Sequence, residues 1–497
     1  MTSPAYAELL AKLGRVHLLS TVTDLLGWDE QVNLPPESAG QRARQMALMA
    51  ELQHAAAGDP RMGELLQTLE AAKTPAGPDE RIILRQARRD YDRMTRLPAE
   101  FVREKATLCS EAYHAWAEAR AKNDFPGYAP FVGRHLELAR REAAYLGYDA
   151  APYDCFIDQM DPGLTVATIG RLFDELKQGL VPLGRKILAA PRKPAAALRG
   201  FPVEEQRGFL REVTERLGFD YQRGRIDVSL HPFCSGTGAD TRMTTRFKED
   251  EPLDSLFGAI HETGHGLYEQ GLPPAAAGTA LGMHAGMGIH ESQSRLWENQ
   301  VARGRPFWRY FEPRFRERFS KQTAGVSSED LYRAINAVEP TPIRVDADEV
   351  TYNLHIILRF EVEKKLFARE LAVQDLPVAW KEASRELLGL EPATDREGVL
   401  QDVHWSGGAF GYFPSYCLGN MIAAQLWYCA LGALPGLEDD FARGDFSRLL
   451  AWLRTNIHAH GRRHEPLALV RVVTGEELSP RHLLRYLQER YGALYPG

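Results

Sequence analysis

The chain has 497 residues, of which 44% are hydrophobic and 26% are charged, a balance typical of a globular protein rather than a disordered or fibrous one. Its 60 basic and 67 acidic residues leave a net charge of −7, so we expect no nucleic-acid partner. No segment approaches the roughly 18 apolar residues needed to span a bilayer. Glu8, Lys12 and Arg15 also interrupt the segment where a signal peptide would need apolar residues. We therefore expect a cytoplasmic protein with no membrane partner.

The first 200 residues are predicted to be helical almost throughout, because apolar residues recur there at three- and four-residue steps. Such stripes run from Leu9 to Leu26 and through 40–56, 78–95, 99–122 and 165–188. The prolines and glycines between Ala189 and Pro202 mark the clearest boundary, which we interpret as a surface loop between helical layers.

The pattern changes after Gly224. Polar and apolar residues alternate over 225–233 and again over 241–247, with a turn signal at Gly236 and Gly238 between them, so we predict two short antiparallel strands. From Pro252 the helical pattern resumes, with further helices predicted at 346–371 and near 416–433. The predicted fold class is mainly α, with one small antiparallel β-sheet.

The segment Leu253–Tyr268 carries the strongest chemical signal. Its apolar residues lie on one helical stripe, and it contains the pattern His261-Glu262-x-x-His265. Histidines four residues apart lie one turn apart on the same helical face, so both imidazoles can reach one zinc ion. The intervening Glu262 lies about 100° around the helix, where it can reach a water molecule without being a ligand. The spacing predicts a metallopeptidase helix.

Two glycines lie inside this predicted helix. Gly264 and Gly266 each cost roughly 1 kcal/mol relative to alanine in a helix interior. We therefore expect a second backbone, or the substrate, to approach the helix closely at these positions.

A catalytic zinc site needs a third protein ligand and one open position. The candidates downstream are Glu269, His284, His290, Glu291 and Glu298. The segment from Gly271 to Ala280 breaks the first helix, and a second is predicted over 291–300. A carboxylate near the start of that antiparallel helix would face the two histidines, which favours Glu291. His290 is the main alternative, and we expect Glu298 to face solvent or a basic partner on its own helix.

The connection 271–289 between the two metal-binding helices is rich in glycine, proline and alanine. It contains little that would anchor it, so we expect it to be mobile and close to the entrance of the substrate groove.

Six ordered motifs resemble those of the carboxypeptidase Taq family of zinc metallocarboxypeptidases. They occupy about a third of the chain and are His231-Pro-Phe233, Asp240-x-Arg242-x-Thr244, His261-Glu-x-x-His265, His290-Glu-Ser-Gln293, Ile343-Arg344-x-x-Ala347-Asp348 and Gly398-x-x-Gln401-Asp402-x-His404-Trp405. The sequence before and after them is similar more loosely.

The resemblance implies a large multi-helix metallopeptidase fold with a long, deep substrate groove. It implies a cytosolic homodimer that removes C-terminal residues other than proline from peptides, with broad specificity. The family's metal positions fall on His261, His265 and Glu291, with Glu262 as the catalytic base. The metal is expected to be one zinc ion per chain, with cobalt as the alternative. We interpret 1–497 as one catalytic unit, with 1–200 forming one wall of the groove and 224–433 supplying the metal and substrate site.

A carboxypeptidase must recognise the free carboxylate of its substrate, and a planar guanidinium does so with two charge-assisted hydrogen bonds. Arg344 is the leading candidate, and Arg242 is the reserve. The alternative for Arg344 is a structural ion pair with Asp346 or Asp348.

Other side chains are candidates for contacts with the reacting carbonyl or the peptide. His404 and Tyr416 could donate hydrogen bonds to the developing oxyanion, and Tyr412 is a weaker candidate. His231 follows the first predicted strand and could line the substrate cleft, although a structural role is almost as good an explanation.

The residues alone leave two other functions open. One is a zinc oligopeptidase that cleaves internally or releases dipeptides, because the zinc-binding pattern does not distinguish these activities. The other is a non-catalytic helical peptide-binding protein with a closed, structural zinc site.

Overall fold

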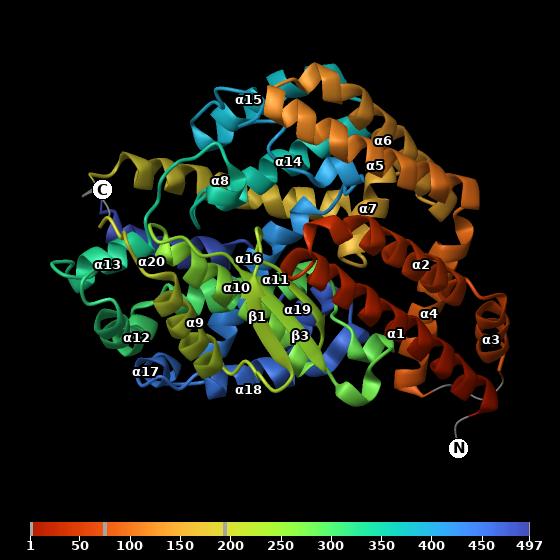
Figure 1. Cartoon of the computed structure of the whole chain (residues 1–497), viewed down its shortest axis with the longest axis horizontal. Helices are drawn as coiled ribbons and strands as arrows, with labels where there is room; N and C mark the ends of the chain where they lie inside the picture. Colours follow the sequence, from red (N-terminus) through yellow and green to blue (C-terminus); the bar gives the residue numbers. More distant parts are fainter. Residues whose placement is uncertain (1–2, 73–76, 192–195, 497) are drawn as a thin grey trace. The chain divides into compact units, whose positions relative to one another are not determined.

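The structure is a computed structural model that describes residues 3–72, 77–191 and 196–496. Figure 1 shows the chain in sequence colours. The chain divides into two compact units. The first comprises 1–95, 196–332 and 426–476, and the second comprises 96–195, 333–425 and 477–497. The chain passes from the second unit to the first within the predicted boundary segment 189–202, of which 192–195 lie outside the described residues.

The first unit contains the small sheet and most of the helices around it. Its helices are α1 (Pro4–Val32), α2 (Ala39–Ala57), α3 (Pro60–Glu70), α4 (Pro78–Arg96), α9 (Val203–Leu217), α10 (Pro252–Gly271), α11 (Met287–Arg295), α12 (Arg305–Arg318), α13 (Ser328–Ile335), α17 (Leu437–Ala442), α18 (Ser447–Asn456) and α19 (Pro466–Thr474). The last residue of α4 and the last three of α13 fall in the second unit. Stacked aromatic rings of Phe311, Phe441 and Phe446 form part of this unit's core.

The described residues of the second unit form helices and connecting loops and contain no strand. Its helices are α5 (Ala99–Lys122), α6 (Phe125–Leu146), α7 (Pro152–Met160), α8 (Val166–Ala189), α14 (Tyr352–Phe367), α15 (Leu376–Leu388) and α20 (Arg481–Leu494), and α16 (Phe413–Ala433) is shared with the first unit. Tyr153, Phe360 and Phe367 pack together in its core. The mainly helical fold class predicted from the sequence is confirmed.

The helix predicted over 346–371 begins later than its apolar pattern suggests. The carboxylate of Asp348 accepts hydrogen bonds from the backbone N–H groups of Val350 and Thr351, at 2.9 Å in both cases. A side chain that caps the backbone in this way competes with a continuing helix on its N-terminal side. Helix α14 therefore starts only at Tyr352.

The small sheet differs from the prediction in strand number and direction. Its strands are β1 (Gly224–Val228), β2 (Cys234–Thr237) and β3 (Asp240–Thr245), in the order β1-β3-β2. The two predicted strands overlap β1 and β3, which pair in parallel, so their predicted antiparallel pairing is wrong. The antiparallel partner of β3 is β2, which forms where the turn was expected. A turn between β2 and β3 reverses the chain, so the sheet is mixed.

Close backbone contact joins α10 to α11, and Gly264 permits it. A Cβ atom at this position would lie 2.5 Å from the Cα atom of Ser294 and 2.6 Å from the carbonyl oxygen of Gln293. The predicted approach of a second backbone is thus confirmed at Gly264. At Gly266 the close neighbour is instead the ring of Phe219, 2.7 Å from the position of a Cβ atom.

The connection between these helices has more anchors than the sequence suggested. The backbone N–H of Ala285 donates to the Tyr268 hydroxyl at 3.1 Å, and Nε of Arg462 donates to the carbonyl of His284 at 3.0 Å. The expectation of few anchors is therefore wrong, while the predicted mobility stays a prediction.

After α11 the chain continues as a π-helical segment, Leu296–Ala302. Each helix in the described part of the chain is too short or too polar to cross a bilayer.

Candidate metal centre

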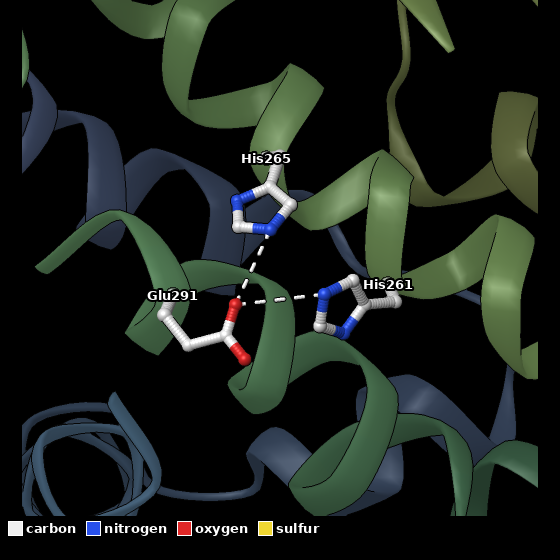
Figure 2. A group of neighbouring side chains, drawn as sticks. All are labelled: His261, His265 and Glu291. Atoms are coloured by element: carbon white, nitrogen blue, oxygen red, sulfur yellow. Dashed lines mark ion pairs between the residues drawn. The ribbon is translucent and has the colours of Figure 1, made fainter. Parts of the chain in front are cut away.

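Three side chains from α10 and α11 meet in the first unit. Nε2 of His261 lies 3.5 Å from Oε2 of Glu291, and Nε2 of His265 lies 3.3 Å from the same oxygen. The nearest ligand atoms of all three residues lie within 4.8 Å of one another. Figure 2 shows one carboxylate oxygen of Glu291 facing both imidazole rings. Among the described residues, this is the one group of three or more candidate ligands with such spacing.

The geometry of this group fits a tetrahedral metal ion. Zinc bonds of 2.0–2.1 Å to nitrogen and oxygen place two ligand atoms of a tetrahedron about 3.3 Å apart. The two nitrogen–oxygen distances, 3.3 and 3.5 Å, match that separation. Two imidazoles and one carboxylate also form the donor set of many catalytic zinc sites, which keep the fourth position open.

A buried carboxylate fixes the orientation of His261. Nδ1 of His261 donates to Oε2 of Glu298 at 2.9 Å, which leaves the lone pair of Nε2 directed toward Glu291. Glu298 also accepts hydrogen bonds from Arg295 and Arg303, each at 3.2 Å. Burial raises the pKa of Glu298, but these guanidiniums and His261 outweigh it and bring the value to about 2. Glu298 therefore has a basic partner on its own helix, as expected, and also contacts a predicted metal ligand.

A longer chain of side chains orients His265. Nε2 of His290 donates to Oε1 of Glu269 at 2.9 Å, so Nδ1 of a neutral His290 accepts a hydrogen bond from Nδ1 of His265. Each predicted histidine ligand thus presents Nε2 to the metal position and is held through Nδ1. Such outer partners fix the tautomer and the ring orientation of metal-binding histidines.

Glu291 is held in its ionised form. Its Oε1 accepts a hydrogen bond from Arg295, one turn along α11, at 2.7 Å. Burial raises the pKa of Glu291, but Arg295 and the two histidines hold that pKa well below its usual range. Of the five downstream candidates for the third ligand, Glu291 is the one that faces both histidines.

Glu262 lies beside this group on α10 and is buried, with 6% of its surface exposed. Burial raises the pKa of its carboxyl group to about 7. No hydrogen bond joins this carboxyl to another described side chain, so it is available to a bound water molecule.

Arg344, His404 and Tyr416 form a second cluster, in the second unit. Nε and Nη2 of Arg344 donate to Oδ1 of Asp402 at 3.0 and 2.8 Å. Arg359 donates to the other oxygen of Asp402 through Nε at 2.7 Å and Nη2 at 2.5 Å. Burial raises the pKa of Asp402, but the two guanidiniums hold it well below its usual range. The alternative interpretation of Arg344, a structural ion pair with Asp346 or Asp348, named the wrong partner, because the ion pair forms with Asp402.

The aromatic candidates surround Arg344. Its guanidinium carbon lies 5.4 Å from the centre of the Tyr416 ring, and the ring of His404 lies 6.5 Å from that of Tyr416 and 5.4 Å from that of Tyr412. Burial lowers the pKa of His404 to about 4, and its Nδ1 atom has no hydrogen-bond partner among the described residues. The ring of His404 is therefore neutral near pH 7, and its Nδ1 atom can donate or accept one further hydrogen bond.

Two predicted substrate-binding residues lie outside both clusters. Arg242, on β3, forms a two-fold hydrogen bond with Asp240 and lies 4.2 Å from the centre of the Trp28 ring. The side chain of His231 is exposed in the loop after β1, where its backbone carbonyl accepts a hydrogen bond from Ser229.

Sequence reasoning missed two contacts of the predicted residues. Glu298 was among the candidates, but its hydrogen bond to His261 was not expected, although Glu298 follows Glu291 by seven residues, two helical turns later on the same face. Asp402 lies within one of the quoted motifs, but its partner Arg344 is 58 residues away in the chain. No local spacing relates two such residues, so their pairing could not be predicted.

Two histidines on one helix and a carboxylate on its antiparallel neighbour, with a buried glutamate beside them, define the chain as a metallopeptidase by its site architecture. Comparison with known proteins gives the same class. The chain is 44% identical to thermostable carboxypeptidase 1 of Thermus thermophilus, with 99% of each chain covered, and 39% identical to carboxypeptidase 1 of Bacillus subtilis, with 98% of each covered.

Comparison with solved structures leads to the same class of protein. The crystal structure of the M32 carboxypeptidase from Deinococcus radiodurans R1 matches with a TM-score of 0.97 and 43% identity over the whole of both chains. Metallocarboxypeptidase 1 of Trypanosoma cruzi matches with a TM-score of 0.94 and 35% identity, covering 98% of this chain and 99% of that one. The profile of the carboxypeptidase Taq (M32) metallopeptidases matches residues 8–491. The chain belongs to this family, and the resemblance inferred from the six motifs is confirmed.

Proposed function

We propose that the protein is a zinc-dependent carboxypeptidase that releases C-terminal amino acids one at a time from peptides. The observation that carries the proposal is the convergence of His261, His265 and Glu291 at tetrahedral spacing, with Glu262 beside them. A bound zinc ion, or cobalt in its place, supplies Lewis-acid chemistry by activating water and polarising the carbonyl of the scissile bond.

Glu262 is the proposed general base. Its carboxylate accepts a proton from the attacking water and then passes that proton to the nitrogen of the departing amino acid. Because Glu262 lies on the same helix as both histidines, the distance from the base to the metal position is fixed by the helix itself. Such fixed placement of reacting groups is a large part of enzymatic rate acceleration.

Arg344 is proposed to bind the terminal carboxylate of the peptide. Nε and Nη2 of its guanidinium donate to Asp402, whereas Nη1 donates only to the Tyr352 hydroxyl at 3.3 Å, so we propose that the Nη1 side meets the substrate carboxylate. Two guanidiniums share the single carboxylate of Asp402, which leaves the buried cluster with an excess positive charge. A substrate carboxylate would compensate that charge, and an internal peptide bond would not.

His404 and Tyr416 are proposed to donate hydrogen bonds to the oxyanion that develops at the scissile carbonyl. Their position around Arg344 and the neutral state of the His404 ring support this role. Arg242 and His231 stay in the proposal as residues that contact the peptide away from the reacting bond. The hydrogen bonds between Arg242 and Asp240 make that arginine a poor second carboxylate clamp.

Broad specificity, poor release of C-terminal proline, a homodimeric state and a cytoplasmic location complete the proposal. They rest on the family resemblance. Light scattering of the purified protein tests the dimer, and a monomer at micromolar concentration would contradict it. A peptide series that differs only in the last residue tests the specificity.

The deciding experiment compares one peptide with a free C-terminus and the same peptide with a C-terminal amide. Mass spectrometry at successive times should show a one-residue ladder from the first and no cleavage of the second. Equal cleavage of both would identify an oligopeptidase instead.

The variant Glu262→Gln should keep its metal and lose turnover by roughly 10²- to 10⁴-fold. This outcome separates an enzyme from a binding protein with a structural zinc, which would show no hydrolysis before or after the change. Loss of the metal together with activity would contradict the assignment of Glu262 as a base rather than a ligand.

A further inference from the structure

Glu363 is a fully buried carboxyl group in the second unit, and it takes no part in the proposed mechanism. It lies on α14, and its relative exposure is 0%. Burial raises the pKa of this carboxyl group to about 7. A buried ionisable group is costly unless its hydrogen bonds are satisfied, so the partners of Glu363 indicate its role.

Three donors converge on the two oxygens of this carboxyl group. The indole N–H of Trp405 donates to Oε1 at 2.6 Å, and the backbone N–H of Gly411 donates to Oε2 at 3.0 Å. The hydroxyl of Tyr153, on α7, also donates to Oε2, at 2.7 Å. Two of the three donors thus belong to one segment, 402–411, which carries His404.

The same helix holds the start of segment 402–411. Arg359, one turn before Glu363 on α14, donates to Oδ2 of Asp402 through Nε at 2.7 Å. Helix α14 therefore holds the first residue of the segment through a cation, and its interior and its last residue through a carboxylate.

Backbone hydrogen bonds close segment 402–411 into compact turns. The N–H of Ala409 donates to the carbonyl of His404, and the N–H of Gly408 donates to the carbonyl of Trp405, both at 3.0 Å. Because these bonds join the two halves of the segment, a shift of Trp405 also shifts His404.

The last residue of the segment packs directly on a helix backbone. Gly411 has a φ of 71°, in the left-handed region that favours glycine. A Cβ atom there would lie 2.7 Å from the backbone carbonyl carbon of Phe156, on α7. Close backbone contact on one side and the carboxyl group of Glu363 on the other thus fix the end of the segment.

The side chain of His404 has little support of its own. Its Nδ1 atom has no hydrogen-bond partner among the described residues and lies 4.0 Å from Oδ1 of Asp402, beyond hydrogen-bond distance. Its ring packs against those of Phe413 and Tyr412, with 4.5 and 5.4 Å between ring centres. The position of His404 therefore depends on the backbone that carries it.

We propose that Glu363 is a positioning residue, which holds His404 in place for the reaction through segment 402–411. This inference rests on the proposed function, in which His404 donates a hydrogen bond to the developing oxyanion. Such a donor is effective only when it is aimed at the position of the oxyanion. A misplacement of about 1 Å can lower the rate roughly 100-fold.

The test uses Glu363→Gln, which keeps the size and shape of the side chain. The NH₂ group of the new amide must face either Trp405 or Gly411, so one N–H donor of the segment then meets another donor. The matched control is Tyr153→Phe, which removes the third donor and leaves both contacts with the segment intact.

Steady-state kinetics of the zinc-loaded enzymes on a free-ended peptide gives the first comparison, at pH 8, above the pKa of Glu363. Glu363→Gln should lower kcat about 10- to 100-fold. KM should change far less, because Arg344 rather than His404 is proposed to bind the terminal carboxylate. Tyr153→Phe should leave kcat unchanged. Equal losses of kcat in Glu363→Gln and Tyr153→Phe would overturn the proposal.

A double-mutant cycle separates a positioning role from a general structural one. His404→Ala should lower kcat by about 100- to 1000-fold. Addition of Glu363→Gln should then cause no further loss, because the group that Glu363 positions is already absent. An equal fold-loss from Glu363→Gln in both backgrounds would overturn the proposal, and so would an unchanged kcat in His404→Ala.

If Glu363→Gln does not fold, as judged by circular dichroism, Trp405→Phe takes its place in the cycle. That change removes the indole N–H and leaves the carboxyl group. Failure of both variants to fold would overturn the proposal, because the network would then be required for the whole unit rather than for one side chain. Absence of any one-residue ladder with the natural enzyme would instead overturn the proposed function, so the two failures are distinguishable.

Discussion

The metal-site cluster of the first unit and the arginine cluster of the second differ in the sign of the charge that burial leaves uncompensated. In the first, the carboxylates of Glu291 and Glu298 face the two guanidiniums of Arg295 and Arg303, and the carboxyl group of Glu262, whose pKa burial raises to about 7, adds a negative charge when it is ionised. In the second, one carboxylate faces two guanidiniums.

This difference in charge makes the two clusters suitable for ligands of opposite charge. A buried charge without a counterion is expensive, so each cluster is best stabilised by a ligand of the missing sign. The first favours a divalent cation, and the second favours a carboxylate. The proposed metal and the proposed terminal carboxylate of a peptide would thus each find a cluster of complementary charge, in separate parts of the sequence.

The anionic side of the comparison is tested most strongly at Glu291. The change Glu291→Gln removes one charge and one ligand, so zinc affinity should fall by roughly a thousandfold or more. Glu298→Gln removes only an outer partner of His261 and should cost roughly 10- to 100-fold. Competition with a chromogenic chelator measures both. Equal losses in the two variants would erase the distinction between ligand and supporting residue.

The cationic side is tested by Asp402→Asn. Removal of the single carboxylate leaves two buried guanidiniums facing each other, and the free energy of unfolding should fall by about 3–5 kcal/mol. The control is Glu118→Gln, because Glu118 and its partner Lys122 form an exposed ion pair whose loss should leave the unfolding midpoint unchanged. Urea denaturation followed by circular dichroism provides the measurement. A small effect of Asp402→Asn would show that another group already compensates these arginines.

The ligand of the cationic cluster is tested by Arg344→Met, which keeps an unbranched side chain and removes the charge. The ratio of kcat/KM between a free-ended peptide and its C-terminal amide should shrink by about 100-fold, because charge-assisted hydrogen bonds to the carboxylate are lost. Steady-state kinetics on the two peptides gives the ratio. An unchanged ratio would assign carboxylate recognition to another residue.

The smallest expected effect concerns pH and the neutral histidine beside the arginines. Burial, together with Arg359 and Arg344, lowers the pKa of His355 to about 3. The folded state therefore excludes a proton that the unfolded chain binds below a pKa of about 6.5, so stability is full above that pH and is lost as the pH falls toward 3. Between pH 7 and pH 5 this histidine should account for about 2 kcal/mol.

The variant His355→Gln should show a correspondingly weaker loss of stability between these pH values, whatever its stability at pH 7. Thermal unfolding at pH 7, 6 and 5 gives the comparison. Parallel pH dependence in the variant and the natural protein would mean that His355 is protonated in the folded state.

Local patterns predicted most of the helices and identified the candidate metal ligands that the structure brings together. Helical periodicity depends on neighbours three and four residues apart, which is why α2, α4, α5 and α8 end within two residues of their predicted bounds. The spacing of His261 and His265 is likewise local.

Features that depend on distant parts of the chain were not predicted. The parallel pairing of β1 with β3 depends on an inserted strand that lacks alternating polarity, Cys234-Ser-Gly-Thr237. The contact of Asp402 with Arg344 and Arg359 joins three separate segments. The π-helical segment Leu296–Ala302 ends just before Gly304 and Pro306, but nothing in its own residues distinguishes it from an α-helix.

Gly264 has a consequence for the choice of metal. At Gly264 the backbone of α10 contacts the backbone of α11 with no side chain between them. The distance between the two helices that carry the candidate ligands is therefore fixed by this backbone contact. If His261, His265 and Glu291 bind the metal as proposed, ions of different radius would be accommodated by small rotations of these side chains rather than by sliding one helix over the other. Gly264 would thus contribute to discrimination between ions of different size, although it has no side chain and contacts no metal.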